Sequence, residues 1–73
     1  MKTLKDVKAG ETAVIKELHT DGAVRYRMMD MGINKGTEVL VKGTSPLGDP
    51  VEISLKGYDI FLRRSDMKKI EVE

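Results

Sequence analysis

The fold of this chain is decided at Met31-Gly32-Ile33-Asn34-Lys35-Gly36-Thr37, where the spacing of apolar residues changes. Upstream, apolar residues recur at positions i, i+4 and i+7, which predicts a short helix whose buried face consists of Val24, Met28 and Met31. Gly32 suits the left-handed conformation that ends many helices, and Ile33 after it is expected to fold back on Met28. From Gly36 onward the period is two residues, as in a half-buried strand.

Three alternating runs follow Gly36, and each predicts an antiparallel strand with one buried face. The residues expected on that face are Val39, Val41, Val51, Ile53, Leu55, Tyr58, Ile60 and Leu62. Lys56-Gly57 is short enough to be a tight hairpin turn between the last two runs. A first strand is expected over residues 11–18, which are rich in β-branched side chains, and a short last strand over residues 70–72.

Polar side chains mark two helix starts. Asp21 precedes the first helix, and its carboxylate is expected to accept a free amide hydrogen of the first turn. Ser65 is expected to cap a single helical turn over residues 65–69, with Asp66 favourable at its start.

The composition predicts one small domain over residues 1–73 with a thin core. The chain has no cysteine, so we expect no disulfide and a reducing, cytoplasmic setting. Thirteen basic and twelve acidic side chains nearly cancel, so nucleic acid is not expected as a partner. Residues 1–8 lack the apolar run of a signal peptide or membrane span, so we expect no membrane insertion.

Catalysis is not expected, because His19 is the only histidine and no Ser/His/Asp or Cys/His set can be assembled around it. His19 and Asp21 supply one imidazole and one carboxylate two residues apart, so they are weak candidates for a metal site that catches an ion only at high concentration. No glycine pattern for binding phosphate occurs, so we expect no cofactor.

The surface is where a partner is expected to bind. Leu47 occupies the middle of the loop Ser45-Pro46-Leu47-Gly48-Asp49-Pro50, where few neighbours can cover it and the prolines reduce the entropy lost on binding. Phe61 lies among charged residues on the face opposite the core. Its side chain is equally expected to be exposed to a partner or covered by the bent barrel, and the same question arises for Leu40. The candidate partner contacts are Pro46, Leu47, Gly48, Asp49 and Phe61, with Arg25 and Arg27 on the helix as secondary contacts. Self-association through Phe61 and Leu40 also remains open.

An ordered set of short motifs spans the chain: Arg27-Met28, Met31-Gly32-Ile33, Gly36-Thr37, Pro46-Leu47-Gly48-Asp49-Pro50, Gly57-Tyr58 and Leu62-Arg63-Arg64. With this set the chain resembles the FeoA family, the small cytosolic protein of bacterial ferrous iron transport, and it departs from the family pattern at Met28, Phe61 and Met67. The resemblance implies a mainly β fold, a small SH3-like barrel of about five antiparallel strands with one short helix inserted after the first strand. Closure into a barrel is also expected from the length, because short strands in an open sheet are marginally stable.

The resemblance further implies an accessory or regulatory protein of ferrous iron transport, a non-enzymatic module that docks on the cytosolic part of the FeoB membrane transporter. Iron(II) would bind such a module at most weakly and transiently. Two alternatives remain open. One is an iron(II)-sensing domain, because iron-dependent repressors carry a similar SH3-like domain. The other is a small nucleic-acid-binding barrel, suggested by the Arg/Lys pairs but disfavoured by the near-neutral charge.

Overall fold

A computed structural model describes residues 1–44 and 46–73, so Ser45 of the Pro/Gly-rich loop lies outside the described residues. Along the chain the elements are η1 (Leu4–Asp6), β1 (Thr12–Leu18), α1 (Gly22–Asp30), β2 (Glu38–Thr44), β3 (Val51–Leu55), β4 (Tyr58–Leu62), α2 (Arg64–Met67) and β5 (Ile70–Val72). The predicted strands and the predicted inserted helix are therefore confirmed. The short 3-10 helix η1 was not predicted, because its apolar residues are isolated among charges.

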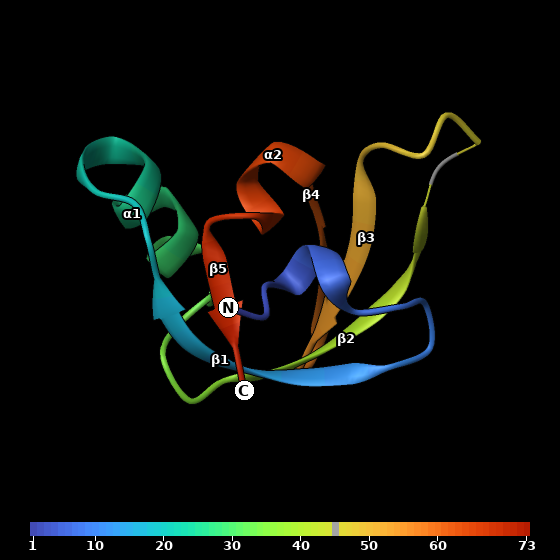
Figure 1. The fold of residues 1–73 in the computed structure, drawn as a ribbon, viewed down its shortest axis with the longest axis horizontal. Coiled ribbons are helices and arrows are strands. Elements are labelled where there is room, and N and C mark those ends of the chain that lie inside the picture. The colour runs from blue at the N-terminus through green and yellow to red at the C-terminus, as the bar shows by residue number, and fades with distance from the viewer. Residues whose placement is uncertain (45) are drawn as a thin grey trace.

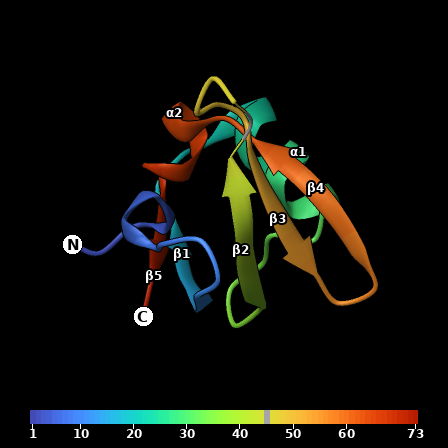
Figure 2. The ribbon, with the colours of Figure 1, turned by 90° about the vertical axis from the view of Figure 1, so that its right-hand side faces the viewer.

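The five strands form one antiparallel sheet in the order β4-β3-β2-β1-β5 (Figure 1). Register shifts in β1, after Ile15, and in β2, after Val41, bend the sheet so that it curls around a single core (Figure 2). Among the described residues no ladder joins β4 to β5, so hydrogen bonds do not close the barrel. Instead, α2 connects these two edge strands and adds the buried Met67 to the core.

The core collects apolar side chains from nearly every element. Its fully buried members with the largest side chains are Leu4, Ile15, Met28, Ile33, Val39, Val51, Ile53, Met67 and Ile70. Leu4 reaches the core because η1 folds over the sheet. The start of η1 is held by the Thr3 amide, which donates to the Asp6 carboxylate at 2.9 Å. No helix in the described part of the chain has the length and apolar character needed to cross a lipid bilayer.

The end of α1 matches its prediction. Gly32 is left-handed with φ +95°, its amide donates to the Met29 carbonyl at 3.0 Å, and the Ile33 amide donates to the Met28 carbonyl at 2.9 Å. These two bonds are those of a Schellman motif, which satisfies the last carbonyls of a helix. Ile33 and Met28 are both buried, so the chain does fold back on the helix at this point.

The N-cap position predicted for Asp21 is confirmed, but the hydrogen bond predicted for its carboxylate is not, and the capping role predicted for Ser65 is wrong. Asp21 is the N-cap residue of α1, but its carboxylate makes no capping hydrogen bond. Ser65 lies inside α2, whose N-cap is Arg63. The first amide of α2, that of Arg64, instead donates to Asp49 Oδ1 at 2.9 Å. A carboxylate from a distant loop therefore does what a serine hydroxyl was expected to do.

The alternation predicted for β4 holds at only one end of the strand. Leu62 is buried, Ile60 is half-buried, and Tyr58, expected in the core, is 50% exposed. Tyr58 directly follows the hairpin turn and pairs with the buried Leu55, and its hydroxyl donates to the Met31 carbonyl at 2.6 Å. Phe61 is 63% exposed, which decides the question left open for it.

Candidate interaction site

The loop between β2 and β3 projects from one end of the molecule (Figure 1). Pro46 is exposed, and Leu47 at the tip is 93% exposed, the highest value among the large apolar residues. Gly48 has φ +83°, a conformation that other residues rarely adopt, so the turn depends on glycine there. The loop therefore presents an apolar side chain that the rest of the described chain leaves uncovered.

The base of this loop is tied to α2. Arg64 Nε donates to the Gly48 carbonyl at 2.5 Å, and the Arg64 backbone amide donates to Asp49 Oδ1 at 2.9 Å. Gly48 and Asp49 thus hold the loop in place, while Pro46 and Leu47 form its exposed part. Because the loop is already ordered at its base, a partner that covers Leu47 meets a preorganised surface.

Phe61 lies near the same end of the sheet. Val51, the first residue after the loop, pairs with Leu62, and Glu52 pairs with Phe61. We call Pro46, Leu47, Gly48, Asp49 and Phe61 the loop surface. The structure therefore places all five predicted contacts at one end of the β2–β3–β4 layer.

The outer face beside Phe61 is charged and internally paired. Lys42 Nζ lies 3.2 Å from Asp59 Oδ2 and 3.8 Å from Glu52 Oε2. The hydrogen bond from Lys42, followed by contacts with Ser54, holds the pKa of Asp59 below its ordinary value, while the Asp59 carboxylate raises the pKa of Lys42. Lys42 thus offsets one of the two carboxylates on this face, and half-buried Leu40 lies on the same face, paired with Ser54.

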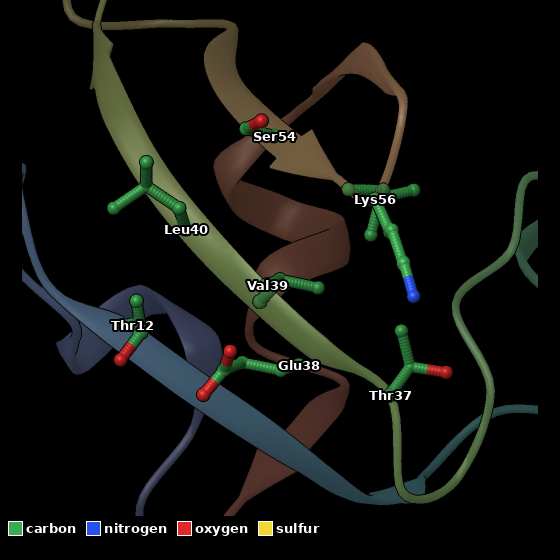
Figure 3. A pocket seen from close by; sticks show the side chains of 8 residues that line it. Thr12, Thr37, Glu38, Val39, Leu40, Ser54 and Lys56 are labelled. Atoms are coloured by element: carbon green, nitrogen blue, oxygen red, sulfur yellow. The ribbon is translucent and has the colours of Figure 1, made fainter.

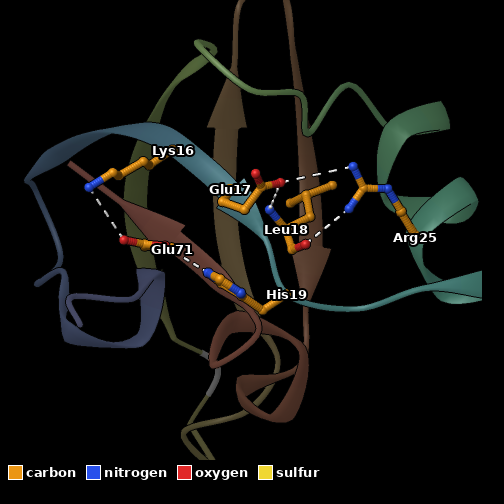
Figure 4. Close-up of polar contacts among 6 residues, drawn as sticks. All are labelled: Lys16, Glu17, Leu18, His19, Arg25 and Glu71. Atoms are coloured by element: carbon orange, nitrogen blue, oxygen red, sulfur yellow. Dashed lines mark hydrogen bonds and ion pairs between the residues drawn. The ribbon is translucent and has the colours of Figure 1, made fainter.

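The two arginines of α1 differ in the bonds that they make to the rest of the chain. Arg25 Nη1 donates to the Leu18 carbonyl at 3.0 Å and Arg25 Nη2 lies 3.9 Å from Glu17 Oε1 (Figure 4), so this half-buried residue fastens α1 to the end of β1. Arg27 is exposed, and its Nη2 lies 3.8 Å from Asp66 Oδ2. Of the two secondary candidates, Arg27 is the one that a partner can reach.

His19 is paired with a residue that the sequence did not suggest. Its Nε2 donates to Glu71 Oε1 at 2.7 Å, and Lys16 Nζ lies 3.6 Å from Glu71 Oε2 (Figure 4). The His19 hydrogen bond, aided by Lys16, holds the pKa of Glu71 below its ordinary value. Glu71 faces outward in β5, and only the β1–β5 pairing, which is unreadable from local sequence, brings it to His19.

No cluster of three or more His, Cys, Asp or Glu side chains that could hold a metal ion occurs among residues 1–44 and 46–73. His19 is bonded to Glu71 and not to Asp21, the partner proposed for it, and a cation near Glu71 would compete with Lys16. The weak metal site at His19 and Asp21 stays a prediction.

A hollow of about 650 Å³ runs along the outer side of β1, β2 and β3 (Figure 3). Hydroxyl groups of Thr12, Thr37 and Ser54 line it, and Glu38 and Lys56 add one charge of each sign. It thus favours neither anions nor cations, and its lining residues supply no nucleophile with an adjacent base.

Known proteins resemble this chain in sequence and in fold. The model of the FeoA domain family matches residues 2–73. The chain is 39% identical over 70 residues to the Fe(2+) transport protein A/Fe(2+) transporter FeoB fusion protein of Porphyromonas gingivalis, and the match covers 96% of this chain but 8% of that protein. It is 34% identical over 73 residues to the putative Fe(2+) transport protein A of Methanocaldococcus jannaschii, covering 100% of this chain and 87% of that one.

Solved structures share the fold. An FeoA-like protein from Clostridium acetobutylicum has a TM-score of 0.89 at 38% identity, covering 99% of this chain and 84% of that one. FeoA of Stenotrophomonas maltophilia, complexed with zinc and described as an SH3 domain protein, has a TM-score of 0.85 at 26% identity, covering 100% and 91%. ScaR with bound Cd2+ has a TM-score of 0.86 at 18% identity, covering 100% of this chain and 34% of ScaR, which shows likeness of fold alone. The expected SH3-like architecture is confirmed.

Proposed function

The chain belongs to the FeoA family of ferrous iron transport, and from that premise we propose that it is a non-enzymatic module that docks, in the cytosol, on the cytosolic part of a FeoB-type membrane transporter. The observation that carries the proposal is Leu47, a large apolar side chain 93% exposed on a loop whose base is held by Arg64. Exposed apolar residues on preorganised loops are favourable anchors, because binding buries area without a large ordering cost.

The fusion relative supports this choice of partner. In Porphyromonas gingivalis, the matching segment belongs to one chain named for both the transport protein A and FeoB. Joining two modules in one chain raises their effective concentration for each other, which is useful when they interact. Because the present chain spans only 8% of that relative, the docking remains a proposal for this protein.

A non-enzymatic role is supported by the hydrogen bonds and ion pairs that the polar residues already make within the chain. The single histidine is bonded to Glu71, and the arginines nearest to it serve as helix anchors or surface charges. We propose that the chain needs no resident cofactor and that iron(II) binds at His19 only weakly. The likeness to ScaR is one of fold, so no specific observation favours the iron(II)-sensing or nucleic-acid alternatives.

The test is an NMR titration of the isotopically labelled protein with the cytosolic domain of its transporter, using variants of the tip. Saturable shifts centred on residues 46–49 and Phe61 are expected. Leu47→Asp should abolish them and Leu47→Ser should weaken binding roughly tenfold, with the fold intact. Asn34→Asp is the matched control, since it adds one negative charge at an exposed position at the opposite end of β2.

Unchanged binding by Leu47→Asp would contradict the role of the loop, and no shifts with the wild-type chain would contradict docking itself. A parallel titration with iron(II) under reducing conditions tests the weak site. Micromolar affinity that disappears in His19→Ala would favour the sensing role instead.

A further inference from the structure

A second concavity lies between η1, α2 and the start of the β2–β3 layer. It measures about 410 Å³ and is lined by Lys5, Asp6, Val7, Lys8, Ala9, Val41, Gly43, Val51, Arg64 and Met67. The floor consists of side chains that also belong to the core, Val7, Val41, Val51 and Met67. We call this concavity the η1–α2 groove.

The rim of the η1–α2 groove is cationic. Lys5, Lys8 and Arg64 stand against one acid, Asp6, and Asp6 Oδ2 already accepts the Thr3 amide at 2.9 Å. Among the described residues Lys16, Arg25, Arg27 and Lys42 each have a carboxylate within 4.0 Å, whereas the other lysines, inside the groove and outside it, have none. Lys5 and Lys8 have no such partner within the described chain, and the Arg64 Nη groups bond to none of its residues. The residues that line the groove thus carry three positive charges and one negative charge, while the Glu11 and Asp49 carboxylates accept the backbone amides of Lys8 and Arg64.

Gly43 leaves open space in the groove. It lies in β2 at the register shift after Val41, and its φ is outside the left-handed region, so its backbone does not require glycine. A Cβ placed there would meet no heavy atom within 4 Å. Glycine within a strand often marks a β-bulge, and the register shift at Gly43 is such a place; the missing side chain also leaves space in the groove that a bound segment can occupy.

Arg64 connects this groove with the loop surface. Its Nε holds the Gly48 carbonyl, while the same side chain lines the groove. A partner seated on Leu47 is therefore adjacent to the cationic rim, and charge complementarity would favour an acidic stretch of that partner next to it.

We propose that the η1–α2 groove binds a segment of the docking partner in which acidic and apolar side chains alternate. The carboxylates of the segment pair with Lys5, Lys8 and Arg64, and its apolar side chains cover Val7, Val41 and Val51 over the space left by Gly43. This inference rests on the proposed docking function, and it adds a second contact of defined chemistry to the exposed Leu47.

Two variants test the groove in binding to the transporter's cytosolic domain. Gly43→Leu fills the space, and the double variant Lys5→Glu/Lys8→Glu reverses the rim charge; each should weaken binding roughly tenfold or more. Lys35→Glu/Lys56→Glu is the matched control, because it makes the same change in net charge at exposed lysines outside the groove and should change affinity by less than about twofold. Retention of the wild-type amide spectrum shows that each variant is folded.

Two peptides separate the groove from the docking function. Acetylated Glu-Leu-Glu-Leu-Glu amide should shift the amides of η1 and β2 in the wild-type chain, and Glu-Ser-Glu-Ser-Glu amide should do so at least roughly tenfold more weakly. Equal binding of both peptides would show an anion site without use of the apolar floor and would overturn the proposal. If the transporter domain binds but neither groove variant weakens it, docking stands and the groove is overturned. If the domain fails to bind but the Leu-containing peptide occupies the groove, docking falls and the groove remains.

Discussion

The hydroxyl of Tyr58 lies over Gly32, at the point where α1 ends, and donates to the neighbouring Met31 carbonyl at 2.6 Å. A Cβ on Gly32 would collide with that hydroxyl. The left-handed turn and the tyrosine contact therefore depend on the same glycine, and together they join α1 to the start of β4.

Replacing Gly32 with alanine should destabilise the protein through two effects. A left-handed backbone costs an ordinary residue about 1–2 kcal/mol, and displacing the half-exposed Tyr58 hydroxyl from its hydrogen bond adds about 0.5–1 kcal/mol. Urea unfolding measures the sum. Gly36→Ala is the matched control, because Gly36 is also left-handed, with φ +90°, but its Cβ would meet no heavy atom. Equal losses for both variants would refute the clash.

Tyr58→Phe should lower the free energy of unfolding by about 0.5–1 kcal/mol, since one partly exposed hydrogen bond is lost and water can replace it at Met31. Hydrogen exchange at the Gly32 and Ile33 amides should accelerate, because the end of α1 loses its tie to β4. Tyr26→Phe, at a tyrosine 68% exposed on α1, should change neither quantity. Unaltered exchange in Tyr58→Phe would show that the Schellman motif alone holds this turn.

Arg64→Lys should loosen the loop without unfolding the protein. Lysine cannot reproduce the Nε bond to the Gly48 carbonyl, whereas the backbone bond to Asp49 remains. Nitrogen-15 relaxation should then report larger ps–ns motion at the amides of residues 47–49. Arg63→Lys, at the exposed neighbour, should leave the relaxation as it is. A rigid loop in Arg64→Lys would assign its order to Asp49.

Glu71→Gln should flatten the acid side of the stability profile. The His19 hydrogen bond, with Lys16, lowers the pKa of Glu71 in the folded state from 4.5, so the carboxylate adds stability above that pH and loses it as the pH falls through the folded-state pKa. Thermal unfolding from roughly pH 3 to pH 7 should show a smaller loss toward acid in Glu71→Gln. Glu73→Gln, at an exposed position, is the control. Identical profiles in wild type and Glu71→Gln would place the acid sensitivity elsewhere.

Local sequence patterns predicted the helices and strands well where a backbone conformation strongly favours one type of residue. Gly32 ends α1 because a left-handed position strongly favours glycine, and the strands after Gly36 alternate because one face of each is buried. Prediction of the capping bonds failed, since Asp21 is the N-cap residue of α1 without accepting an amide and the first amide of α2 bonds to the distant Asp49 and not to Ser65. Tyr58 was misplaced because alternation cannot show that its hydroxyl reaches the Met31 carbonyl at the end of α1.

The candidate site, like the fold, could be predicted from the sequence only in part. Exposure of Leu47 followed from its place in a short Pro/Gly-rich loop, where few neighbours are available. The ties of Arg64 to Gly48 and Asp49, the pairing of Glu71 with His19 and the η1–α2 groove all join residues distant in sequence. Sequence by itself thus determined the order of helix and strands, the turns and the family, because these depend on local backbone preference and burial period. Only the tertiary structure decided which charges are paired, which tyrosine leaves the core and where an unfilled cationic groove remains, because these depend on how the curled sheet brings remote side chains together.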